Sequence, residues 1–119
     1  MILSMLLSMV MNINAVPLER PVLTIAQGQV ESRLNPKAVG KAGERGAWQV
    51  MEKTWGKVPK KLDGQARQAE RILQELISEN KGDHFEALVK YNSYHNRKAG
   101  VKYACKVRKR AFELATIGV

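Results

Sequence analysis

The stretch QVESRLNPKAVGKAGERGAWQVM, residues 29–51, decides how this chain folds. It begins at the end of an apolar segment with helical spacing, and Asn35-Pro36 ends that helix because the residue before a proline disfavours helical backbone. The glycines at positions 40, 43 and 46 then predict a loop with tight backbone turns. We therefore expect Glu31 to be held at the junction of a helix and a tightly folded loop.

Helical patterns continue on both sides of this stretch. Before it, Pro21 suits the first turn of a helix, and apolar residues follow at helical spacing up to Val30. Beyond it we expect four more helical segments, each with an apolar face or a capping signal. They are a short helix within 49–58, a helix capped by Asp63 and closed by Gly82, a helix with Asp83 and Glu86 as a capping box, and a helix over about 97–116.

The chain has 119 residues, which is room for one domain. Its 45% hydrophobic and 26% charged residues are ordinary for a globular protein and argue against disorder. No alternating strand pattern, internal repeat or low-complexity tract interrupts the helical pattern. The sequence predicts a single all-α domain over residues 18–116.

The N-terminal segment requires a separate interpretation. Its apolar run ILSMLLSMVM, residues 2–11, is too short to span a bilayer, which takes roughly 20 apolar residues. It suits the apolar core of a signal peptide, with INA at 13–15 as the cleavage site, although no Lys or Arg precedes it. We predict a signal peptide over 1–15, export to the periplasm or the exterior, and no membrane span after cleavage.

The charge of the chain indicates an anionic partner. Twenty Lys and Arg against eleven Asp and Glu give +9, which suits nucleic acid, an anionic membrane or an acidic wall polymer. The single Cys105 excludes an internal disulfide, and its place on an apolar helical stripe predicts a small buried hydrophobe. His84 and His95 lack neighbours with ligand spacing, so we expect no metal, and no nucleotide-binding loop is present to predict a cofactor.

Glu31 is the candidate for chemistry. It shares a helix face with Thr24, Gln27 and Gly28, and Gly28 permits close approach by a ligand or by another segment. A glutamate on a helix is usually solvated. When it is buried against apolar neighbours its pKa rises, and it then holds a proton near neutral pH, as glycosidic bond cleavage requires.

These residues carry a resemblance to a known family. The stretch from Glu31 to Met51 resembles the signature of the soluble lytic transglycosylases, lysozyme-like enzymes that cut bacterial peptidoglycan. The segments ALVKYNS, residues 87–93, and YACKV, residues 103–107, are similar to two further motifs of that family, so that the likeness covers about 18–115. Matching positions in the signature are Glu31-Ser32, Asn35-Pro36-Lys37-Ala38, Gly43, Gly46, Gln49 and Met51. The sequence departs from the family at Ala47-Trp48, where the family has Leu-Met, and at 93–96, where the family's glycines are absent.

The resemblance implies a lysozyme-like domain in which Glu31 is the catalytic acid. The candidates for contact with the glycan are Ser32, Gln49, Tyr91 and Asn92, together with Trp48 on the chemistry of its side chain. Tyr91 is expected to hydrogen-bond either Glu31 or the sugar acetamido group. Two roles stay open for Ser32, which orients the carboxylate or caps the helix, and for Trp48, which stacks on a sugar or packs in the core.

The expected mechanism needs one acid, because Glu44 and Glu52 are interpreted as surface charges. Trp55 is interpreted as a core residue. Glu31 would cleave the bond between N-acetylmuramic acid and N-acetylglucosamine, and the muramic 6-hydroxyl would close a 1,6-anhydro ring. The expected partner is the peptidoglycan glycan strand, with secretion or phage machinery as a further candidate; we expect a monomer and no nucleic acid.

Three alternatives remain. A hydrolytic lysozyme of the same fold, similar to the goose type, would use water in place of the 6-hydroxyl. A nucleic-acid or polyanion binder would use the basic segment KYACKVRKRAF, residues 102–112. A scaffold within a secretion or phage machine would keep the fold without activity.

Overall fold

The structure, a computed structural model, describes residues 18–93 and 95–118, so the predicted signal peptide over 1–15 lies outside the described residues. The helices are α2 (Pro21–Ser32), α3 (Glu52–Trp55), α4 (Leu62–Glu79), α5 (His84–Asn92) and α6 (Arg97–Thr116). Strand-like pairing within the described ranges is limited to isolated bridges, Val39 with Arg45 and Arg45 with Val50. The predicted all-α fold is confirmed. No helix of the described part is long and apolar enough to cross a membrane.

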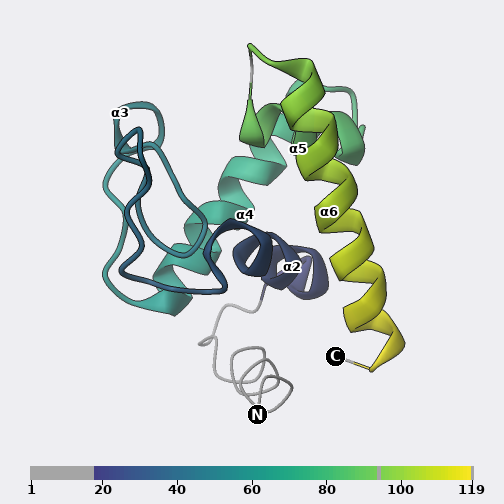
Figure 1. Cartoon of the computed structure of the whole chain (residues 1–119), viewed down its shortest axis with the longest axis horizontal. Coiled ribbons are helices and arrows are strands. Elements are labelled where there is room, and N and C mark those ends of the chain that lie inside the picture. Colours follow the sequence, from purple (N-terminus) through teal and green to yellow (C-terminus); the bar gives the residue numbers. More distant parts are fainter. Residues whose placement is uncertain (1–17, 94, 119) are drawn as a thin grey trace.

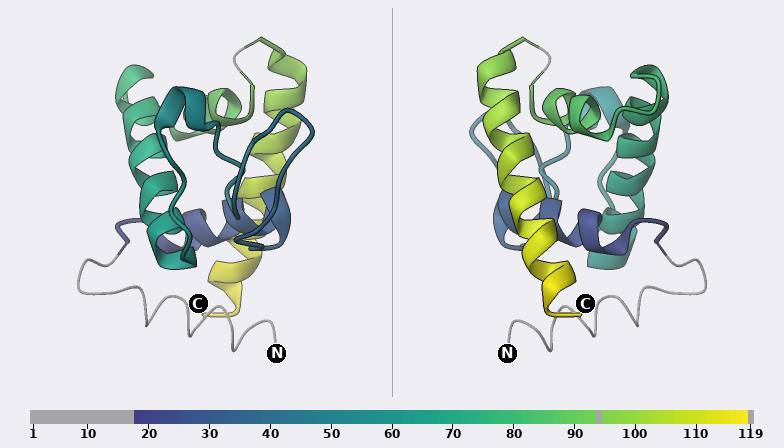
Figure 2. Two further views of the ribbon diagram at one scale, coloured as in Figure 1. Left: turned by 90° about the vertical axis from the view of Figure 1, so that its left-hand side faces the viewer. Right: turned by 90° about the vertical axis from the view of Figure 1, so that its right-hand side faces the viewer.

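Helices α4 and α6 form the two sides of the helical part, with α2 crossing between their lower ends and α5 lying between their upper ends (Figure 2). The segment 33–61, which includes α3, forms a lobe beside α2 and α4 (Figure 1). Helices α5 and α6 pack so closely that a Cβ on Gly100 would lie 2.6 Å from the carbonyl oxygen of Val89. Fully buried side chains from four helices fill the space between them: Ile25, Leu73, Leu76, Leu88, Val107 and Leu114.

The start of α4 differs from the prediction. Asp63 is not the cap, because the helix begins at Leu62 and Lys61 occupies the cap position. Asp63 lies in the first turn, where its carboxylate favours the helix dipole, and it pairs with Arg67 one turn later at 3.5 Å. The acid therefore marks the helix start, but from inside the helix.

The junctions around α5 match the prediction more closely. Gly82 has a left-handed φ of 85° and its N–H donates to the Ile77 carbonyl, which closes the turn after α4. Asp83 caps α5 by accepting a hydrogen bond from the Glu86 N–H at 3.0 Å. The second half of the capping box is replaced, because the Glu86 carboxylate binds Arg97 at the start of α6.

The buried face of α6 leaves out some of the apolar side chains of the helix. Cys105, which was predicted to be a small buried hydrophobe, is exposed, and Phe112 is exposed to 76%. The buried residues are instead Gly100, Tyr103, Ala104, Val107 and Leu114. This stripe is the buried one because α6 packs on both α2 and α5. The close approach at Gly100 fixes the rotation of α6 about its axis. The exposed side of α6 that carries Cys105, Phe112 and Ala115 lines a hollow of about 810 Å³ beside the start of α2.

Candidate functional site

Glu31 lies in the last turn of α2, immediately before a sharp reversal of the chain. Arg33 and Leu34 both adopt left-handed backbone, with φ of 59° and 61°, and the Leu34 N–H donates to the Gly28 carbonyl at 3.1 Å. Two consecutive non-glycine residues in this region are strained, and such strain persists only where surrounding contacts enforce it. The reversal ends the helix within two residues of the acid.

The contacts that enforce the reversal come from the returning loop. Trp48 packs against α2 where Gly28 leaves room, since a Cβ on Gly28 would collide with Leu34 and with the Trp48 ring. The Trp48 Nε1–H donates to the Thr24 carbonyl at 2.7 Å, and the side chain is only 1% exposed. The close approach that Gly28 permits is therefore made by another segment of the chain. Of the two roles left open for Trp48, packing in the core is the observed one, and no ring face is available for a sugar.

Ser32 fastens the same junction. Its hydroxyl donates to the Ala47 carbonyl at 2.8 Å and accepts from the Asn35 N–H at 3.0 Å. Both partners of the Ser32 hydroxyl are backbone groups, so these hydrogen bonds fit the capping role and not direct contact with the Glu31 carboxylate. Ser32 thus links the end of α2 to the loop that covers it.

Gln65 of α4 contacts the loop from the other side, a role that no signal in the sequence indicated. Its Oε1 accepts from the Ala47 N–H at 2.8 Å, and its Nε2 donates to the carbonyls of Pro36 and Pro59. Gly46, with a φ of 82°, lets the backbone turn directly above this side chain. One buried amide therefore holds three loop segments together.

Two tyrosines enclose the carboxyl group of Glu31. Tyr91 of α5 and Tyr103 of α6 stack with parallel rings whose centroids are 6.3 Å apart. The Glu31 residue is half-buried, but its carboxyl group is surrounded by protein, and this burial raises its pKa to about 7. A hydrogen bond with the Tyr103 side chain lowers the pKa, and the charge of Glu44 raises it. Glu31 thus holds a proton in a large fraction of molecules at neutral pH.

The tyrosine that contacts Glu31 is not the expected one. The Tyr91 hydroxyl donates to the Trp48 carbonyl at 3.0 Å, so its proton is not directed at Glu31. The partner of Glu31 is Tyr103, which is 6% exposed and was not among the predicted site residues. Burial and the charge of Glu31 raise the pKa of both phenols well above their ordinary value, which keeps both protonated as donors. The YACKV segment was the sequence signal that could have identified Tyr103.

A cavity of about 300 Å³ lies beside Tyr91. It brings together Gln49, Tyr91 and Asn92, three of the predicted substrate-binding residues. Gln49 has a left-handed φ of 50°, and its Nε2 donates to the Gly46 carbonyl. Trp55, interpreted from the sequence as core, is only half-buried and lines the same cavity. The tryptophan at this cavity is therefore Trp55 and not Trp48.

Glu44 and Glu52 are not free surface charges. The half-buried Glu44 carboxylate accepts from the Ala42 N–H at 2.9 Å and acts electrostatically on Glu31. Glu52 accepts from the Val58 N–H at 2.8 Å and lies 3.4 Å from the Arg45 guanidinium. Both acids stabilise loop backbone. No group of three or more His, Cys, Asp or Glu side chains suited to a metal occurs in the described part of the chain.

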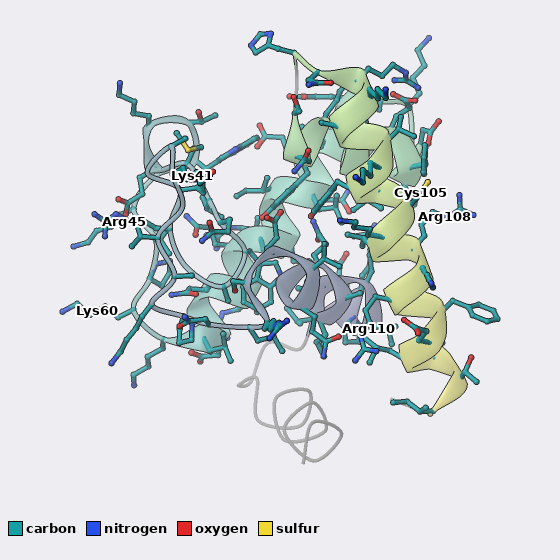
Figure 3. The ribbon with its side chains drawn as sticks, in the orientation of Figure 1. Lys41, Arg45, Lys60, Cys105, Arg108 and Arg110 are labelled. Atoms are coloured by element: carbon teal, nitrogen blue, oxygen red, sulfur yellow. The ribbon has the colours of Figure 1, made fainter. Side chains whose placement is uncertain are left out.

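The basic residues of α6 have different environments. Arg108 lies 5.5 Å from the centre of the Phe85 ring, and Arg110 hydrogen-bonds Gln29 of α2. Lys102, Lys106 and Lys109 are exposed. On the opposite flank Lys41, Arg45 and Lys60 project from the loop lobe (Figure 3). The positive charge therefore flanks the site on both sides, and only part of α6 is a solvated basic face.

Comparison with known proteins identifies a family for this chain. Residues 17–111 match the family described as the transglycosylase SLT domain. Neither the curated proteins nor the solved structures contain a match.

The raised pKa of Glu31 predicts a pH-dependent gain in stability for Glu31→Gln. Between the unfolded value of 4.5 and the folded value of about 7, the unfolded chain loses its proton first, so the wild type loses stability as pH rises. The variant avoids this loss. We expect nearly equal stability at pH 4 and an advantage of about 3 kcal/mol for the variant at pH 8 in urea denaturation. Glu75→Gln, at an exposed site on α4, should change stability by less than about 0.5 kcal/mol at either pH. A stability difference between Glu31→Gln and the wild type that does not change with pH would contradict the raised pKa of Glu31.

Proposed function

This chain belongs to the transglycosylase SLT domain family, and we propose that it is a peptidoglycan lytic transglycosylase with Glu31 as its single catalytic acid. The bond cleaved is the β-1,4 linkage between N-acetylmuramic acid and N-acetylglucosamine, and the product ends in 1,6-anhydro-N-acetylmuramic acid. One observation carries the proposal: the Glu31 carboxyl group is buried against Tyr103, with a pKa of about 7. A carboxyl group in this state can donate a proton and later accept one at neutral pH.

The reaction requires two proton transfers. Protonated Glu31 donates to the glycosidic oxygen as the bond to the muramic anomeric carbon breaks. The substrate's own N-acetyl group stabilises the developing cation, and Tyr103 hydrogen-bonds the carboxylate that forms. Glu31 then takes the proton from the muramic 6-hydroxyl as the hydroxyl oxygen bonds to the anomeric carbon. The acid is regenerated and no water is consumed.

Substrate binding is proposed for the cavity beside Tyr91. Gln49 and Asn92 offer amide donors and acceptors to sugar amides, and Trp55 offers an aromatic surface. Ser32 and Trp48 are assigned a scaffolding role, because their polar atoms bind backbone carbonyls and Trp48 is buried. These two residues would affect activity through the position of Glu31.

The place of action follows from the substrate. We propose that the protein is exported and acts on the wall as a monomer, in the periplasm, outside the cell or in a virion, with phage or secretion machinery as a further partner. Its net charge of +9 would attract it to anionic wall polymers, and the exposed lysines of α6 are available for this contact. Attraction to the wall accounts for the positive charge without a nucleic-acid partner.

A hydrolytic lysozyme is the alternative that one observation favours. Glu44 influences the pKa of Glu31, so a second carboxylate does act on the site. However, the Glu44 carboxylate already accepts a hydrogen bond from the backbone of its own loop, which opposes a role as base for a water molecule. The two reactions differ in their products.

The first activity prediction concerns the acid itself. Glu31→Gln keeps the size of the side chain but cannot donate the proton, so wall cleavage should fall on the order of 10² to 10⁴-fold. Turbidity loss of purified peptidoglycan measures the rate, and circular dichroism checks the fold. Glu75→Gln is the charge-matched control and should retain full activity. A folded Glu31→Gln protein with more than a tenth of wild-type activity would remove Glu31 from the mechanism.

The second activity prediction separates lyase from hydrolase. The 6-hydroxyl is tethered to the reacting sugar, and such intramolecular groups reach effective molarities on the order of 10⁵ M. Mass spectrometry of the digest should therefore find 1,6-anhydro ends, one water lighter than lysozyme products. Glu44→Gln and Glu52→Gln should give the same product. Reducing muramic ends as the main product, lost in Glu44→Gln, would establish the hydrolase instead.

A further inference from the structure

Gln27 is a buried polar side chain with no role in the mechanism described above. It lies one helical turn before Glu31 on α2 and is fully buried. Its Nε2 donates to the Tyr103 hydroxyl oxygen at 3.1 Å. Its Oε1 has no hydrogen-bond partner among the described residues, and an unsatisfied buried carbonyl is unfavourable. Stability alone therefore does not account for an amide at this position.

The direction of the Tyr103 hydrogen bonds explains what the amide does. A phenol has one proton to donate, whereas an ionised carboxylate can only accept. Tyr103 hydrogen-bonds Glu31, so its proton points to Glu31 and its oxygen is left to accept from Gln27. With the opposite amide orientation, Gln27 Oε1 would take the phenol proton, and Glu31 would lose its donor.

We propose that Gln27 is a positioning residue that directs the Tyr103 hydroxyl proton at Glu31. The inference rests on the proposed function in so far as Glu31 is the acid. Because Tyr103 donates to one carboxyl oxygen, the proton of the neutral acid resides on the other oxygen, which remains available to the glycosidic bond. Gln27 thus selects the oxygen from which Glu31 delivers its proton, without contacting the substrate.

Other groups near Glu31 do not provide this control. Tyr91 on α5 uses its proton for the Trp48 carbonyl. Glu44 in the loop acts on Glu31 through charge and offers no donor. On α6, Tyr103 is the group whose side chain hydrogen-bonds Glu31. Because donation from Gln27 polarises the phenol, it strengthens the hydrogen bond from Tyr103 to Glu31.

The test is a carbon-13 NMR titration of the Glu31 carboxyl group in the substrate-free protein. Tyr103→Phe should raise the Glu31 pKa by about one unit, since a hydrogen bond to the carboxylate is lost. Gln27→Met should raise it by roughly 0.3 unit, because the Tyr103 donor is weakened and no longer fixed. The double variant should match Tyr103→Phe alone, since Gln27 acts through Tyr103. A fall or no change in Gln27→Met, or additive shifts in the double variant, would overturn the proposal.

Gln68→Met is a matched control. Gln68 on α4 is also a buried glutamine whose Oε1 has no partner in the described part of the chain, and its Nε2 donates to the carbonyls of Gly56 and Lys57. It should leave the Glu31 pKa unchanged; an equal rise would show general loosening and overturn the proposal. Gln27→Met removes an unsatisfied carbonyl and should fold, and Gln27→Leu allows the same comparison if it does not.

Kinetics provide the second readout. Gln27→Met should lower kcat roughly two- to tenfold with little change in KM, and should move the pH profile upward in parallel with the Glu31 pKa. A change in KM alone would contradict a positioning role. The titration needs no substrate, so it distinguishes the two claims: the expected pKa shifts in a protein that cleaves no glycan would reject the proposed function and retain the positioning of Tyr103.

Discussion

The packing of Trp48 into the space beside Gly28 is the contact on which the candidate site depends. It brings the loop back onto α2, where Ser32 and Ala47 join the two segments. The strained reversal at Arg33 and Leu34 persists because these contacts enforce it. The Trp48 carbonyl in turn fixes the Tyr91 hydroxyl. The loop, α2 and α5 are thus held together around the Glu31 carboxyl group.

The sequence predicted the helices well and the tertiary contacts less well. Periodicity, Pro21 and the Asp83 cap are local signals, and they located α2, α4, α5 and α6 with small errors such as the one at Asp63. The predicted burial of Cys105 on α6 was wrong because α6 contacts two helices, and a single helix offers more than one apolar stripe. Which stripe is buried depends on the partner helices, which periodicity does not identify.

The residues of the candidate site likewise divide into those that local signals predicted and those that depend on long-range contacts. The place of Glu31 at a helix–loop junction followed from local backbone signals. The assignments of Trp48 and Tyr91 depended on long-range contacts. Trp48 fills the gap at Gly28, and Tyr91 binds the Trp48 carbonyl. Tyr103 reaches Glu31 from α6, more than sixty residues later in the chain. The network that results leaves Gln27 partly unsatisfied and buries an acid. Both features lower stability, which is expected where geometry serves chemistry.

The central claim is that burial keeps Glu31 protonated near neutral pH. The most direct measurement is the absolute titration midpoint of the Glu31 carboxyl carbon in the wild-type protein, followed by NMR from pH 3 to 9. Burial of the carboxyl group and the charge of Glu44, partly offset by the hydrogen bond with Tyr103, predict a midpoint of about 7. A midpoint at the ordinary value of 4.5 would mean that the carboxyl group is solvated, and would contradict the account of the site.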